Sequence, residues 1–431
     1  MNLLKTISPW IVSAALCLLA VEVLGAALFY RATNSLVYFN QPKVAAAEPT
    51  AALVYKRHLH PYFGYTGPYA SRGPTGTPTN NLGFIDTQPR EVPFKPDPND
   101  FVVFVFGGSV ASRLTNNSTH ARPSLQEALQ KLPQLAGKNI VLYNMAQGPG
   151  KQPQQLMELA FLIASGQHID LVLNLDGTLE FAIGMNNFAL GVDPIFPPGD
   201  IMLAIGNELA PQGASSAQYY ELAYRLTHAR AESERYARLL DNSSSGIAYI
   251  KNRAFKAVYD RSLERNLGVY NQTIGGDNVR KLLGLDTPIK TPREKVIEYI
   301  FDMWMRSSDL MKIMASSTGA TYLNIVLPSP YYSKKVFTES EQAFMKAPAL
   351  EYFRQANAAG YALIESRGEM LKSRGIVSGI ALFDDVHEAT FADGSGHLVR
   401  LGEAMLAEFV VAQVGPRLGS GNQVGRPTRS D

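Results

Sequence analysis

The stretch Phe101-Val-Val-Phe-Val-Phe106-Gly107-Gly108-Ser109 decides the fold class of this 431-residue chain. Its six apolar residues favour β-structure and predict a strand buried on both faces, which is typical of a parallel sheet. The two glycines allow a sharp turn after the strand and leave Ser109 open to a ligand. In open α/β sheets, ligands bind at the carboxyl ends of the strands. Ser109 is therefore either the N-cap of a following helix or a residue that meets a substrate.

Strands and helices alternate after this stretch, and this order predicts an α/β fold with a parallel sheet. The further strands that we expect are Asn139–Tyr143, Ile169–Leu175, Thr321–Leu327 and Ile376–Phe383. The last predicted element is an amphipathic helix over Gly402–Val414.

We divide the chain into five segments by composition and periodicity. They are a membrane anchor over 1–33, an irregular stalk over 34–100, an α/β core over 101–189 and 318–414, a helical insertion over 190–317, and a polar tail over 415–431 that we expect to be disordered.

The segment from Pro9 to Tyr30 is almost entirely apolar, and as a helix it would be about 33 Å long, close to the thickness of a bilayer core. Glu22 is its only charge, and a carboxylate there is costly unless a neighbouring helix or a proton compensates. A cleaved signal peptide is the alternative, but the small-residue stretch Val44-Ala-Ala-Ala47 lies well beyond the apolar run. We therefore expect an uncleaved, single-pass anchor. Basic residues flank it on both sides, so charge does not decide its orientation.

The charge of the chain is nearly balanced, with 40 Lys and Arg against 38 Asp and Glu, so nucleic acid is not an expected partner. The single cysteine, Cys17, lies inside the anchor and excludes an intramolecular disulfide and a cysteine-based metal site. His58 and His60 are two candidate ligands without a third. We expect no metal and no other cofactor.

A serine nucleophile needs a base beside it, because a free serine hydroxyl is a weak nucleophile. Of the seven histidines, His397 has the most informative context, since it follows Asp393-Gly-Ser-Gly and precedes the last predicted helix. Gly402 and Leu406-Ala407 follow it at the head of that helix.

In these residues the chain resembles the SGNH/GDSL hydrolases. Their signature is a Ser after the first strand, a Gly after the second, an Asn after the third, and an Asp-x-x-His before the last helix. The segments His60-Pro-Tyr-Phe-Gly-Tyr65, Asn80-Asn-Leu-Gly-Phe84 and Gly150-Lys-Gln-Pro-Gln-Gln155 resemble the membrane-anchored bacterial members, many of which are similar to exopolysaccharide-modifying proteins. The resemblance implies a flavodoxin-like three-layer sandwich. It also implies that Ser109 is the nucleophile, His397 the base and Asp393 the carboxylate that orients the base.

The second and third blocks of the family are only partly matched. Asn144-Met-Ala-Gln-Gly148-Pro-Gly150 corresponds to the second block, in which a glycine N–H helps to form the oxyanion hole, and the spacing to Gln154-Gln155 favours Gly150 over Gly148. Gly177-Thr-Leu179-Glu180 corresponds to the third block, but Leu179 stands where the family has Asn. Loss of one such donor typically costs about 10²–10³ in rate.

The last block also departs from the family. Gly394 stands three residues before His397, and the nearest carboxylate, Asp393, stands four before. The alternative pair Asp384-Asp385-Val386-His387 has the literal family spacing, but it lies farther from Gly402.

The resemblance implies an ester hydrolase or O-acyltransferase that acts on acylated polysaccharide, a small ester or another cell-envelope ester. It would be anchored in the bacterial inner membrane, with its catalytic domain in the periplasm. Leu179 and Gly394 favour a second function, a catalytically inactive scaffold that binds glycan or a partner protein in polysaccharide biosynthesis. The sequence does not identify the acyl group, the acceptor or any protein partner.

Overall fold

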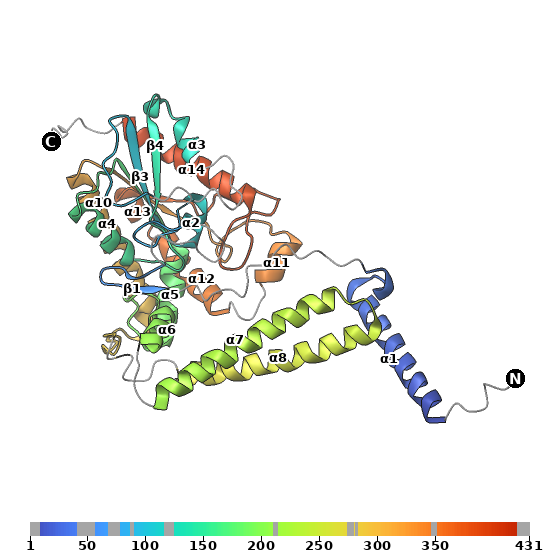
Figure 1. Ribbon diagram of the computed structural model, residues 1–431. Helices are drawn as coiled ribbons and strands as arrows, with labels where there is room; N and C mark the ends of the chain where they lie inside the picture. Colours follow the sequence, from blue (N-terminus) through green and yellow to red (C-terminus); the bar gives the residue numbers. More distant parts are fainter. Residues whose placement is uncertain are drawn as a thin grey trace. The chain divides into compact units, whose positions relative to one another are not determined.

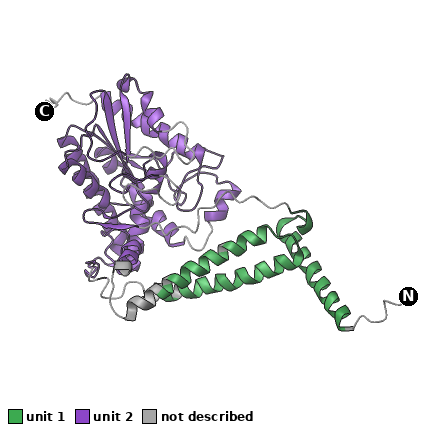
Figure 2. Cartoon of the chain, viewed as in Figure 1, with its two compact units in different colours: residues 1–52, 207–279 green, residues 53–206, 280–431 purple. Residues whose placement is uncertain are grey.

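A computed structural model describes residues 9–40, 57–67, 78–86, 90–115, 125–209, 214–273, 280, 283–345 and 351–419. The chain divides into two compact units, which Figure 2 shows in different colours. The smaller unit combines Met1–Ala52 with Asn207–Val279, and the larger unit combines Leu53–Gly206 with Arg280–Asp431. The predicted cleavage stretch at residues 44–47 lies outside the described residues.

The larger unit is built on a five-stranded parallel sheet with the strand order β4-β3-β5-β6-β7 (Figure 1). Its strands are β3 (Asp100–Gly107), β4 (Asn139–Asn144), β5 (Leu171–Asp176), β6 (Thr321–Val326) and β7 (Ile376–Ser378). When the five strands of this sheet are numbered along the chain, the order is 2-1-3-4-5, which doubly wound α/β sheets adopt. The direction of winding reverses at β3, and the crevice for a ligand is expected at the carboxyl ends of β3 and β5.

Strand β3 is buried on both faces, as its unbroken apolar sequence predicts. Phe101, Val103 and Val105 face one hydrophobic cluster, and the alternating residues from Val102 to Phe106 face another. The expected α/β architecture with a parallel sheet is therefore confirmed, and the predicted strand positions agree closely for β3 to β6.

Helices cover both faces of the sheet. On one side lie α2 (Ser109–Thr115), α3 (Leu125–Gln130), η3 (Pro133–Leu135) and α14 (Arg400–Gly419). The other side is covered by α4 (Gln154–Ala164), α5 (Thr178–Ala189), α10 (Val296–Ser317), α12 (Glu351–Ser366) and α13 (Gly368–Ser373). The remaining described elements of this unit are β1 (His58–His60), β2 (Gly64–Thr66), η4 (Arg293–Lys295) and α11 (Glu339–Met345). Helix α6 (Gly199–Leu209) crosses the boundary between the units.

The described parts of the lead-in before β3 pack against the core. Strands β1 and β2 form an antiparallel hairpin, and Phe63, Leu82, Phe84 and Val92 are buried in the hydrophobic cluster under α4. Their aromatic and aliphatic side chains supply the burial that the Pro- and Gly-rich composition obscures.

The helical insertion is shorter than the predicted 190–317. Only Asn207–Val279 belongs to the smaller unit, whereas α10 packs on the sheet through Trp304, Met311 and Ala315. The amphipathic pattern of α10 belongs to a crossover helix between β5 and β6. The tail also starts later than expected, because α14 continues to Gly419; residues 420–431 lie outside the described part.

The smaller unit contains three helices and one short turn of 3₁₀ helix, η2 (Val37–Phe39), among its described residues. Helices α7 (Ala214–Asp241) and α8 (Gly246–Thr273) form a hairpin, and α1 (Pro9–Thr33) packs against the start of α8. By length and composition, α1 is the one described helix that could cross a membrane. This agrees with the expected anchor and leaves its orientation open.

Candidate active site

Ser109 lies at the carboxyl end of β3, as the sequence predicts, and it begins α2. Both preceding glycines lie in tight surroundings. Gly107 has a φ of 143°, and a Cβ on it would lie 2.5 Å from the carbonyl oxygen of Leu175. A Cβ on Gly108 would lie 2.0 Å from Cδ1 of Leu179. The strand therefore ends in a turn that requires glycine at position 107, and the turn presents the Ser109 hydroxyl.

The structure brings Ser109, His397 and Asp393 together. Nε2 of His397 lies 2.7 Å from Oγ of Ser109, and Nδ1 lies 2.6 Å from Oδ2 of Asp393. A carboxylate at Nδ1 favours the tautomer that carries its proton there, which leaves Nε2 free to accept the Ser109 proton. The three side chains thus have the geometry of a serine, base and carboxylate triad.

Asp393 is held ionised by its neighbours. Burial alone would raise its pKa, but the hydrogen bond and charge of His397, together with the N–H groups of Ser395 and His397, hold the pKa below its usual range. The carboxylate accepts the Ser395 N–H at 2.9 Å. The departure at Gly394 therefore does not remove the carboxylate partner, because the turn at residues 393–397 brings Asp393 to His397 from four residues away.

The literal Asp-x-x-His alternative does not reach Ser109. Asp384 accepts hydrogen bonds from the Ser333 hydroxyl at 3.0 Å and the Lys334 N–H at 2.9 Å. His387 is exposed. Both residues lie in the loop after β7, and Asp384 holds the loop that follows β6.

The N–H groups of the two glycines after β4 are not arranged as the spacing predicts, which favoured Gly150. The Gly150 N–H donates to the carbonyl oxygen of Gln147 at 2.5 Å, so it is already bonded. Gly148 lies beside the nucleophile, since a Cβ on it would be 3.1 Å from Cβ of Ser109. Its N–H forms no hydrogen bond with a backbone group of the described residues. Of the two glycines, Gly148 is therefore the one that lies beside Ser109 and whose N–H has no backbone partner among the described residues.

The sequence analysis missed the residues that hold this loop. The guanidinium of Arg57 donates to the Gly148 carbonyl at 2.8 Å and lies 5.1 Å from the centre of the Tyr65 ring. The side-chain amide of Gln147 donates to the Tyr65 carbonyl at 3.0 Å, and that of Gln154 donates to the Phe63 carbonyl at 2.7 Å. The β1–β2 hairpin thus fixes the loop beside Ser109. In the sequence, the three aromatic residues between Tyr62 and Tyr65 are the feature that could have predicted a packed segment here.

A buried polar network lies beneath the turn after β5. The Glu180 carboxylate accepts the Gly177 N–H at 2.7 Å, and Asp176 accepts the indole N–H of Trp304 at 2.9 Å. Burial raises the pKa of both carboxyls. Lys151, also fully buried, donates to the carbonyls of Gln152 at 2.9 Å and Pro194 at 2.7 Å. These contacts fix the turn that carries Leu179, and Asp176 and Glu180 are buried within it.

A cavity of about 930 Å³ lies where the loops after β6 and β7 meet α12 and α13. Tyr331 and Tyr332 line it. Burial and then the charge of Asp393 raise the pKa of Tyr331 to about 12, so this residue links the cavity to the surroundings of the triad.

The comparisons with known proteins add no relative to this geometry. No protein-family model matches the chain, and no curated protein is similar in sequence.

Proposed function

We propose that the chain is a membrane-anchored serine esterase or O-acyltransferase of the SGNH type, with a flavodoxin-like core. The observation that carries the proposal is the continuous contact from Ser109 through His397 to Asp393 at the carboxyl ends of the strands. The resemblance favours acylated polysaccharide or another cell-envelope ester as the substrate. It also favours a periplasmic catalytic domain at the bacterial inner membrane.

The chemistry follows from the three side chains. Oγ of Ser109 attacks the acyl carbon while Nε2 of His397 takes its proton, and Asp393 stabilises the imidazolium that forms. In this proposal the N–H groups of Ser109 and Gly148 donate to the oxyanion. His397 then returns the proton to the leaving alcohol. Water or an acceptor hydroxyl releases the acyl group from Ser109, which gives hydrolysis or transfer.

A second function, an inactive scaffold for glycan or a partner protein, is favoured by one observation. The side chain of Leu179 fills the space above Gly108, where an oxyanion donor would be useful. An apolar group there leaves only backbone donors, and each lost donor costs about 10²–10³ in rate.

Labelling with a fluorophosphonate separates the two functions. Such a reagent reacts with a serine whose proton a neighbouring base removes, so the active enzyme should be labelled on Ser109, as peptide mass spectrometry would show. The Ser109→Ala variant, with unchanged thermal melting, is the control and should stay unlabelled. Absence of label from the folded wild-type protein would support the scaffold and contradict the esterase.

A further inference from the structure

Strand β7 lies at one edge of the parallel sheet, since it pairs only with β6. The N–H of Gly379, directly after the strand, donates to the carbonyl oxygen of Val326 at 2.9 Å. Successive residues of a strand direct their backbone groups to opposite edges, so Val377 faces β6 as Gly379 does, whereas Ile376 and Ser378 face outward. The backbone N–H and C=O groups of these two residues are therefore left without a neighbouring strand.

The cavity of about 930 Å³ that Tyr331 lines runs alongside this free edge. Its lining includes the whole of β7, with Leu371 and Lys372 of α13 from one face of the sheet and Gln413 and Arg417 of α14 from the other. Because β7 is the last strand, a space that touches helices of both faces lies beyond the edge of the sheet. We call this space the β7 groove.

The walls of the β7 groove suit the side chains of an extended chain. Ile364, Leu371 and Ile380 contribute apolar surface, and Tyr331 and Tyr332 of the loop after β6 add aromatic surface. An extended chain directs every second side chain to the same side. One set of its side chains would thus lie against the groove, while its backbone lies beside β7.

The unpaired charge of the β7 groove is positive. Lys334 and Lys372 are exposed, line the groove and form no ion pair with the described residues. The carboxylates of the groove are already bonded, since Glu365 accepts the hydroxyl of Tyr332 at 2.5 Å and Asp384 accepts two hydrogen bonds from the loop after β6. An occupant with acidic side chains would complement this charge.

We propose that the β7 groove binds an extended, acidic peptide segment of a partner protein, which joins the sheet as a strand beside β7. The backbone groups of Ile376 and Ser378 would bond to the peptide backbone, and Lys334 and Lys372 would pair with its carboxylates. A peptide is the ligand that offers N–H and C=O groups at the spacing of a strand. This site serves a partner and does not depend on the proposed ester chemistry.

Selection of peptides on the full-length protein in detergent tests the proposal. The probe is a phage-displayed library of random short peptides, and the enriched sequences are then made as free fluorescent peptides for binding titrations. We expect enriched peptides that alternate apolar with polar residues and carry acidic residues.

Methylation of the peptide backbone shows whether the bound peptide is a strand. Only every second N–H of an added strand faces β7. On the unaltered protein, an N-methyl group at one of these positions should weaken binding about tenfold or more, whereas methylation of the intervening positions should have little effect. This pattern does not depend on the folding of any variant.

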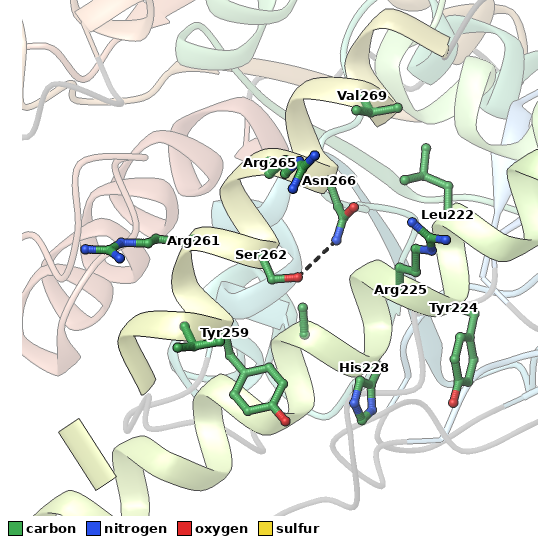
Figure 3. Close-up of a pocket in the computed structure, with 12 residues that line it drawn as sticks. Leu222, Tyr224, Arg225, His228, Tyr259, Arg261, Ser262, Arg265, Asn266 and Val269 are labelled. Atoms are coloured by element: carbon green, nitrogen blue, oxygen red, sulfur yellow. Dashed lines mark hydrogen bonds between the residues drawn. The ribbon is translucent and has the colours of Figure 1, made fainter. Parts of the chain in front are cut away.

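Two variants that fill a groove locate the site. Ala381 is exposed and lines the β7 groove, so Ala381→Trp should weaken binding about tenfold or more without changing thermal melting. The matched control lies in a groove of about 700 Å³ between α7 and α8, where Figure 3 shows Tyr224 and His228 of α7 and Asn266 of α8. Helix backbones are bonded internally and offer no strand edge, so Val258→Trp in that groove should leave binding unchanged.

Lys334→Glu with Lys372→Glu should also weaken binding, with the larger effect at low salt. The proposal is overturned if no peptide is enriched, if N-methylation weakens binding equally at every position, or if Val258→Trp removes binding and Ala381→Trp does not. A dimer of the chain that dissociates in the Ala381→Trp variant would also overturn it, because the groove would then belong to a second copy.

Discussion

The side chain of Leu179 occupies the space over Gly108, so that a Cβ on the glycine would lie 2.0 Å from Cδ1 of the leucine. The residue after that glycine is Ser109, so an apolar group lies at the place where a polar donor would serve the proposed reaction. This contact is the reason to test whether the protein is a slow enzyme or an inactive scaffold.

Leu179→Asn should raise the turnover of small acyl esters, because the amide adds a donor beside the developing oxyanion. A well-placed donor is worth about 3–4 kcal/mol, and the gain should be smaller here because the site is shaped around leucine. Ester hydrolysis by the purified variant is the measurement. Leu179→Ala is the control that removes bulk without adding a donor. If the asparagine variant folds and binds a substrate yet shows no turnover, the enzyme assignment loses its main support.

His397→Ala should abolish fluorophosphonate labelling and ester turnover, since the side chain is within 2.7 Å of the Ser109 hydroxyl. His387→Ala should leave both near the wild-type level, because His387 is exposed in the loop after β7. Both variants should melt at similar temperatures. If His387→Ala lost labelling and turnover while His397→Ala kept both, the base would be His387 of the Asp384-x-x-His387 pair instead.

Lys151 should make the free energy of unfolding depend on pH. Burial lowers its pKa to about 7, against the opposing charges of Glu180 and Asp193. An unfolded lysine has a pKa of about 10.4, so between about pH 7 and pH 10 the unfolded chain binds more protons, and stability rises with pH.

Lys151→Met should remove this rise. Relative to the variant, the wild-type protein should gain up to about 2–3 kcal/mol in free energy of unfolding from pH 7 to pH 9. Urea unfolding followed by the fluorescence of the buried Trp304 measures the difference, with the exposed Lys131→Met as the control. If the free energy of unfolding changed with pH in the same way for the wild-type protein and for Lys151→Met, Lys151 would stay charged in the folded state.

The protein should remain in the membrane fraction after an alkaline wash, with its N-terminal segment intact. The reason is that α1 is long and apolar enough to span a bilayer, with no small-residue site close behind it in the sequence. Mass spectrometry of the purified chain is the measurement. A soluble mature form that begins near Glu48 would exclude the anchor.

The core of the fold could be predicted because its signals are local. A run such as Phe101–Phe106 has no stable place outside a buried strand, and the two glycines before Ser109 mark the turn that follows it. The pairing of His397 with Asp393 was also predictable, because both residues lie in one short turn before α14.

The remaining features depend on contacts between distant segments. Gly150 seemed the better donor by spacing, but its N–H is used by Gln147, and only the folded loop shows that Gly148 lies beside Ser109. Composition does not reveal that Phe63 and Phe84 enter the core. Nothing in the sequence near Glu22 indicates that its partner would be Gly246, more than two hundred residues later.

Ser109 and His397 are separated by 288 positions in the chain. Contacts of such long separation form late, because the intervening chain must be ordered first. During synthesis the serine emerges long before its base, after α1 and before most of the sheet. Under the proposed function, a growing or truncated chain therefore holds a serine without its base, and Ser109 becomes a nucleophile only when the turn that carries His397 is in place. Reactivity toward a fluorophosphonate would thus report completion of the fold itself, and it would do so only after the N-terminal helix has had time to reach its lipid environment.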